Sequence, residues 1–184
     1  MPSNTNIGSV AAFAVFAISC LSSTAWGQNI DFQVNNITLE QVVSLPAGDS
    51  AVLPDGTNDF DQTAIILQSG ADNGAVTSAT SSPGAAIAVL QGGTGNRATA
   101  LIENSPGSSI ANVQLGRDNA ILAAIRGGAN NTIATAQIGN GLGLAAGLEN
   151  STDATLIYGQ GGENYNGAVV FRNVPPGTVI RVGD

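Results

Sequence analysis

The sequence predicts an all-β fold: a two-sheet β-solenoid of five 23-residue strand–turn–strand repeats, stacked as in amyloid-like cross-β structure. The first observation is a glutamine that recurs every 23 residues without insertion or deletion, as Gln68, Gln91, Gln114, Gln137 and Gln160. The second is a glycine two residues after each glutamine, as Gly70, Gly93, Gly116, Gly139 and Gly162. The third is that short β-prone runs such as TAIILQ and ATALIE alternate with turn-forming segments such as NSPG. A sequence period of this length is typical of solenoids and related arrays.

Each repeat starts six residues before its glutamine, which gives the units 62–84, 85–107, 108–130, 131–153 and 154–176. A first strand is expected up to the glutamine, followed by a tight G-x-x-N turn and a second strand. The turn asparagines are Asn73, Asn96 and Asn119, and Leu142 and Tyr165 replace them in the last two units. Glycine adopts positive φ without steric cost, and asparagine tolerates the left-handed region. The tail, 177–184, is expected to form a further strand or a partial cap.

Alternation along each strand predicts which side chains face the core. On the first strand, the residue four positions before the glutamine is aliphatic in the later units: Ile87, Ile110, Ile133 and Leu156. On the second strand, the residue eleven positions after the glutamine gives Ile102, Ile125, Leu148 and Phe171. Stacking at ~4.8 Å places the glutamine amides over one another. Each amide is therefore expected to donate to the next, in the amide ladder of cross-β structure, and the asparagine column is expected to do the same.

The composition excludes several classes of function. The chain of 184 residues contains no histidine and one cysteine, which leaves no Cys/His zinc site and no Ser-His-Asp or Cys-His dyad. Five basic residues against 13 acidic ones give a net charge of −8, the wrong sign for a nucleic-acid-binding protein. No strand column stacks Asp or Glu, and there is no lysine. We therefore expect neither an enzyme nor a cofactor or metal site.

The N-terminal region is predicted to direct export. Residues 1–27 resemble a secretory signal peptide, with a nine-residue apolar run at 10–18 and a small-x-small site at Ala25-Trp26-Gly27, so cleavage is expected before Gln28. Lipoprotein processing at Cys20 is the alternative. Residues 28–61 hold six acidic residues and no basic one, and form an acidic leader.

The repeats resemble those of the curlin family, the subunits of the bacterial extracellular amyloid fibres called curli. The family repeat has the form S-x5-Q-x-G-x-G-N-x-A-x3-Q, and residues 91–98 (QGGTGNRA) match its Q-x-G-x-G-N-x-A segment. The resemblance covers 62–176. In two respects the chain departs from the family pattern. The second glutamine is replaced by an apolar column running from Ala79 to Phe171, and the initial serine is present only as Ser108.

The resemblance implies a secreted structural subunit that self-assembles by templated strand addition into curli-like amyloid fibres at the cell surface, for biofilm matrix and adhesion. It implies three partners: further copies of this chain, a related curlin subunit and, during export, an outer-membrane secretion pore addressed by 28–61. The glutamine, asparagine and glycine columns would then be the self-assembly residues. The alternative is that the same repeats form a monomeric, non-amyloid β-solenoid, an adhesin or an ice- or surface-binding protein. On that alternative, 28–61 is a disordered acidic leader that keeps the chain soluble.

Overall fold

The structure is a computed structural model that describes residues 62–183. The predictions made for 1–27 and 28–61 lie outside these residues. Eleven strands follow one another along the described chain: β1 (Thr63–Ala71), β2 (Gly74–Thr80), β3 (Ala86–Thr94), β4 (Arg97–Glu103), β5 (Ser109–Arg117), β6 (Ala120–Ala129), β7 (Thr132–Asn140), β8 (Gly143–Thr152), β9 (Thr155–Glu163), β10 (Asn166–Arg172) and β11 (Val179–Gly183). No helix that could span a membrane is found among the described residues.

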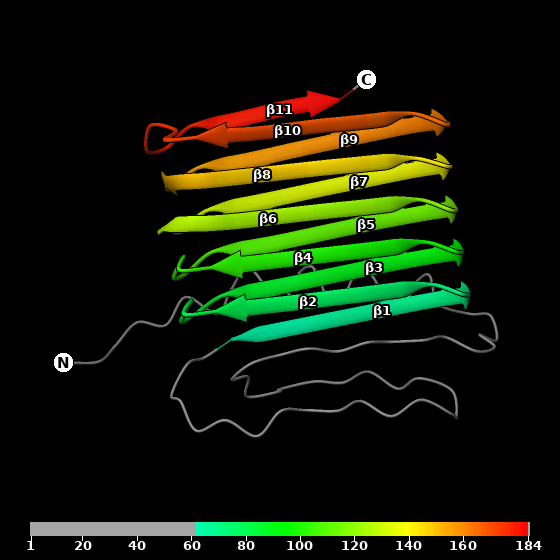
Figure 1. Ribbon diagram of the computed structural model, residues 1–184, viewed down its shortest axis with the longest axis horizontal. Coiled ribbons are helices and arrows are strands. Elements are labelled where there is room, and N and C mark those ends of the chain that lie inside the picture. The colour runs from blue at the N-terminus through cyan, green and yellow to red at the C-terminus, as the bar shows by residue number, and fades with distance from the viewer. Residues whose placement is uncertain (1–61, 184) are drawn as a thin grey trace.

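The strands form two parallel sheets that rise together as a rod (Figure 1). The odd sheet has the order β1-β3-β5-β7-β9-β11, and the even sheet has the order β10-β8-β6-β4-β2. We call one odd strand and the even strand that follows it a rung. From β1 to β10 each residue pairs with the residue 23 positions later, for example Gln91 with Gln114 in the odd sheet and Ile102 with Ile125 in the even sheet. The predicted two-sheet β-solenoid of stacked 23-residue repeats is confirmed.

The core is a thin layer between the two sheets. The predicted columns Ile87, Ile110, Ile133 and Leu156 of the odd sheet and Ile102, Ile125 and Leu148 of the even sheet are buried in it. Phe171 packs against this core but is only half-buried, because β10 is the last strand of the even sheet. Small residues such as Ala100 and Ala123 fill the middle of the even sheet, which explains how a chain with so few aromatic residues closes a core.

The tail forms a further strand with a shifted register. Strand β11 pairs with the first five residues of β9, from Thr155 to Gly159, with an offset of 24 residues instead of 23. The extra residue lies in the turn before β11, where Pro175 is followed by a second proline, Pro176. The C-terminal end of the rod is therefore stepped, since β11 extends the odd sheet one strand beyond β10 (Figure 1).

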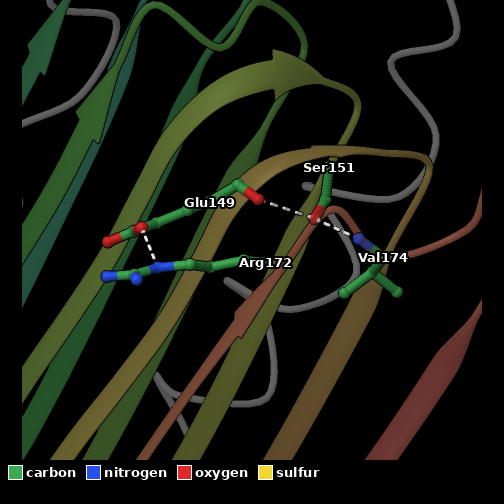
Figure 2. Close-up of polar contacts among 4 residues, drawn as sticks. All are labelled: Glu149, Ser151, Arg172 and Val174. Atoms are coloured by element: carbon green, nitrogen blue, oxygen red, sulfur yellow. Dashed lines mark hydrogen bonds and ion pairs between the residues drawn. The ribbon is translucent and has the colours of Figure 1, made fainter.

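A column of alternating charge follows the outer side of the even sheet. Glu103, Arg126, Glu149 and Arg172 occupy the same position on four successive strands. Arg126 Nε lies 3.1 Å from Glu103 Oε2, and Arg172 Nε lies 2.5 Å from Glu149 Oε2. Figure 2 shows the second of these ion pairs beside the turn that leads out of β8. The alternation places unlike charges on neighbouring rungs throughout the column.

Reversing the middle charge tests this column. The substitution Arg126→Glu places three carboxylates on successive rungs, so we expect a loss of about 1 kcal/mol of unfolding free energy at low ionic strength. The loss should shrink at high ionic strength, because both charge partners are partly exposed. Urea denaturation followed by circular dichroism measures both values. Arg97→Glu is the matched control, since its neighbours in the sheet are Gly74 and Ala120. Equal losses for the two variants would contradict the pairing.

Candidate functional site: amide ladders and rod ends

The five predicted glutamines form one continuous hydrogen-bonded ladder inside the rod. Nε2 of each glutamine donates to Oε1 of the glutamine on the next rung, at 2.5 Å from Gln68 to Gln91, 2.7 Å from Gln91 to Gln114, 3.0 Å from Gln114 to Gln137 and 2.9 Å from Gln137 to Gln160. The three middle side chains are fully buried. A buried amide without partners would destabilise the fold, and stacking supplies a partner at every rung.

The second N–H of these glutamines links the two sheets. Gln91 Nε2 donates to the Gly74 carbonyl at 3.1 Å, and Gln114 Nε2 donates to the Arg97 carbonyl at 3.0 Å. Gln137 and Gln160 make the equivalent bonds, to the Ala120 and Gly143 carbonyls. Each accepting carbonyl lies at the start of an even strand one rung earlier. The ladder therefore joins neighbouring rungs and opposite sheets at the same point.

The ladder is directional, and its two ends differ chemically. All four donors point from a lower rung to the next higher one, so the N-terminal end of the ladder presents an oxygen. That oxygen, Gln68 Oε1, is buried and has no hydrogen-bond partner. At the other end, Gln160 Nε2 donates to the Gly143 carbonyl, and no glutamine stands above it in the described ladder. The ladder therefore begins with an acceptor oxygen and ends with a donor nitrogen.

The asparagine column closes the first turn mainly through the backbone. Asn96 Nδ2 donates to Asn73 Oδ1 at 3.0 Å, as predicted for an amide ladder, and also to the Gly116 carbonyl of the next rung at 3.0 Å. Asn119 makes the equivalent bonds from its backbone N–H to Asn96 Oδ1 and from its side-chain amide to the Gly139 carbonyl, and at this rung the link to the asparagine below is the one from the backbone. Asn119 Oδ1 in turn accepts from the backbone N–H of Leu142 at 3.0 Å. The column therefore caps the turn of the following rung even where that rung has lost its own asparagine.

The glycine column allows two rungs to approach closely. At Gly70, Gly93, Gly116 and Gly139, a Cβ atom would lie 1.8–1.9 Å from the carbonyl oxygen of the next glycine in the column. All five glycines also have positive φ. Gly162 differs from the other four, because nothing lies within 4 Å of a Cβ built there. The position at Gly162 is thus open in the single rod.

Two further columns were not predicted. In the first turn, one position has positive φ on every rung. Residues with a side chain alternate there with glycine, as Asp72, Gly95, Asp118, Gly141 and Asn164. This keeps carboxylates two rungs apart. In the second turn, serine hydroxyls accept from the backbone one rung later, as when Ser105 N donates to Ser82 Oγ and Val174 N donates to Ser151 Oγ (Figure 2). Their 23-residue spacing was visible in the sequence, but serine in a turn is too common to be singled out without the register.

Within 62–183 there is no group of three or more His, Cys, Asp or Glu side chains that could hold a metal ion. Comparisons of the chain with family models, with curated proteins and with solved structures give no match.

Proposed function

We propose that the protein is a secreted structural subunit that adds end to end to further copies of itself, building extracellular curli-like fibres for biofilm matrix and adhesion. The observation that carries the proposal is the directional glutamine ladder. The unpartnered oxygen of Gln68 at one end and the amide Nε2 of Gln160, a donor, at the other are complementary in two stacked copies. Contact between them would satisfy a buried acceptor that the single rod leaves open.

The strand edges at the C-terminal end support the same mode of growth. Natural sheets block edge pairing with prolines or with charged side chains that point inward. Strand β10, with the sequence NGAVVFR, has no proline, and its inward residues are Gly167, Val169 and Phe171. Val169 and Phe171 are only partly buried. An incoming strand β2 would cover them and extend the even sheet by parallel strand addition.

If the next copy is to continue the 23-residue register without a break, β11 must separate from β9. Strand β11 covers only five residues of β9 and brings no glutamine to the ladder. Strand β1 of an incoming copy would repeat the nine-residue pairing seen between β7 and β9, with Gln68 in the column of Gln160. Because nine pairs replace five and the ladder continues, exchange of β11 for an incoming β1 is favoured. The remaining features of the proposal, export through an outer-membrane pore and a related partner subunit, come from the curlin resemblance.

The open position at Gly162 gives a test of the proposal. In a seamless stack, alanine at 162 would meet the carbonyl of Gly70 of the next copy, as alanine at each lower glycine would meet the glycine above it. We therefore expect the chain from Gln28 onward to grow into fibres, and Gly162→Ala to fold yet to elongate wild-type seeds at least tenfold more slowly. Thioflavin T fluorescence, electron microscopy and a fibre reflection at about 4.7–4.8 Å measure the growth.

Gly161→Ala is the matched control. Nothing lies within 4 Å of its added Cβ, and the φ of Gly161 lies outside the positive region that strains a residue with a side chain. This variant should grow like the wild type. Growth of Gly162→Ala at the wild-type rate would rule out seamless stacking at this end. A wild-type protein that stays soluble, folded and monomeric for days would overturn the proposal and favour the monomeric adhesin or surface-binding solenoid.

A further inference from the structure

The C-terminal end of the rod is only partly covered (Figure 1). Strand β11 pairs with Thr155–Gly159, the first five residues of β9, and β10 is the last strand of the even sheet. In the described rod, no strand therefore lies above residues 160–172, which are the second half of β9, the first turn and β10. We call this stretch the open edge. Tyr165 in its turn is 46% exposed, whereas Leu142, one rung below, is 1% exposed, so the turn is exposed at a position that the lower rungs bury.

The N-terminal end carries the counterpart of the open edge. Residues 68–80 lie four repeats earlier and comprise the second half of β1, the first turn and β2. If a second copy continues the register of the rod, its Gln68 lies over Gln160 and its Gly70 lies over Gly162. The second copy then supplies the acceptor oxygen that the ladder lacks above Gln160 and a residue without a side chain above Gly162.

The first turn is complementary in a way that does not depend on the ladder. Asp72 begins the column of positive-φ residues in this turn, and Asn164 ends it, so Asp72 of a second copy lies over Asn164. The same combination is present inside the rod at the second turn, where Asn130 Nδ2 donates to Oδ1 of Asp153 on the next rung at 3.2 Å and φ is 53° at both residues. An aspartate at both ends of the column would place two carboxylates against each other. The amide at the upper end therefore suits the acid at the lower end of another copy.

We propose that the open edge is the docking site where an incoming copy first binds, through its residues 68–80, and that β11 is displaced only afterwards. The order rests on the proposed fibre function and on what each part of the contact requires. Docking on 160–172 breaks no strand pairing of the rod. The remaining residues of the incoming β1, 63–67, can pair with β9 only where β11 now lies. Because these residues directly precede Gln68, the exchange starts at Gly159 and replaces each lost pair with β11 by a pair with β1.

Strand β11 covers the core of the soluble chain until this exchange. Its residues Ile180 and Val182 pack against the core and are paired with Leu156 and Tyr158, which are buried. Docked residues 68–80 do not reach this part of β9. Loss of β11 before docking would therefore expose apolar surface to water, whereas loss during the exchange does not. Displacement of β11 is thus the step that joins the docked copy to the rod.

Proline substitutions on the two uppermost strands separate docking from stacking on β11. In a parallel sheet, alternate residues of a strand bond to the same neighbour. In the even sheet, the N–H of Gly143 donates up to the next rung, so on β10 the N–H of Ala168 points to the open side. In the odd sheet, the N–H of Thr155 donates up to the residue before β11, so on β11 the N–H of Arg181 points away from β9. Proline at either position therefore removes no strand-pairing hydrogen bond of the single rod.

Ala168→Pro should elongate wild-type seeds at least about tenfold more slowly, because the incoming β2 loses a ladder bond and meets the proline ring. Arg181→Pro is the matched control and should elongate seeds at least as fast as the wild type, because β11 leaves. Thioflavin T fluorescence measures both rates, and circular dichroism verifies that both variants fold. Wild-type growth of Ala168→Pro would rule out docking on the open edge, and arrest of Arg181→Pro would show that the next copy stacks on β11. Both outcomes leave the fibre proposal standing, whereas a wild-type chain that forms no fibres would overturn the two together.

A reversible disulfide tests the displacement of β11 by itself. In Ile157→Cys/Arg181→Cys, the two cysteines are paired in register on β9 and β11, and the chain from Gln28 onward has no other cysteine. Paired residues on neighbouring strands lie ~4.8 Å apart, within the roughly 4.4–6.8 Å that a disulfide spans. The oxidised chain should elongate seeds at least about tenfold more slowly, and a reductant should restore growth. Mass spectrometry verifies the disulfide, and equal growth of the oxidised and reduced chains would overturn the displacement.

Discussion

Alanine at Gly116 is expected to cost more than about 4 kcal/mol of unfolding free energy, enough to leave much of the chain unfolded. The added Cβ would lie 1.8 Å from the Gly139 oxygen and 2.8 Å from its carbonyl carbon. Both atoms belong to backbone that is paired on each side, so relief requires β5 and β7 to move apart. A φ of +124° adds strain for any residue with a side chain. Urea denaturation followed by circular dichroism measures the loss.

Two glycines one rung from the end separate the causes of this loss. Gly162→Ala carries the same kind of φ strain but meets no atom within 4 Å, so about 1–2 kcal/mol is expected. Gly161→Ala has neither problem and should stay within about 0.5 kcal/mol of the wild type. A Gly116→Ala variant no less stable than Gly162→Ala would show that the rungs separate easily at the first turn.

Replacing Gln114 with leucine is expected to cost about 3–5 kcal/mol. Leucine fills nearly the same volume, so the loss comes from polar groups and not from a cavity. Three groups lose their partner: the N–H of Gln91 Nε2, the oxygen Oε1 of Gln137 and the carbonyl of Arg97. Each lies in or beside the buried core, where an unpaired polar group costs about 1–3 kcal/mol. The measurement is again urea denaturation of freshly diluted chain.

The end of the ladder provides the comparison for Gln114. Gln68 makes one side-chain hydrogen bond, to Gln91 Oε1, and its own oxygen has no partner. Gln68→Leu should therefore cost about 1 kcal/mol or less. If the two leucine variants were equally stable, the ladder would be a consequence of stacking that adds nothing to the stability of the single rod.

The repeat period made most of the fold predictable. Once Gln68 and its successors lie 23 residues apart, parallel stacking places every residue over its counterpart, and alternation within a strand decides which columns are inside. Ile110, Ile125 and the glutamine column therefore occupy the expected places. The glutamine amides bond to one another as predicted, since the ~4.8 Å spacing of rungs suits a primary amide.

Other features depend on geometry that the period does not contain. The ladder has a direction because each spare N–H reaches a carbonyl one rung below, such as that of Arg97, and this is set by side-chain rotamers. Asn119 is a second case: its backbone N–H, and not its side-chain amide, donates to Asn96 Oδ1, while the side-chain amide donates to the Gly139 carbonyl of the next rung. Phe171 was expected in the core and is half-buried, because a column position does not tell how many strands follow it.

The constant register also determines how a rod of this kind can change length. One residue inserted within a strand would turn the later side chains of that strand from the core to the surface, whereas loss or duplication of a whole 23-residue unit returns each column to equivalent neighbours. Among residues 62–183, the register shifts at Pro176, after the last complete rung, where a strand of five residues follows. Duplication of a unit would therefore alter the height of this rod in steps of ~4.8 Å, one rung at a time, whereas a single extra residue is accommodated in a turn, as at Pro176.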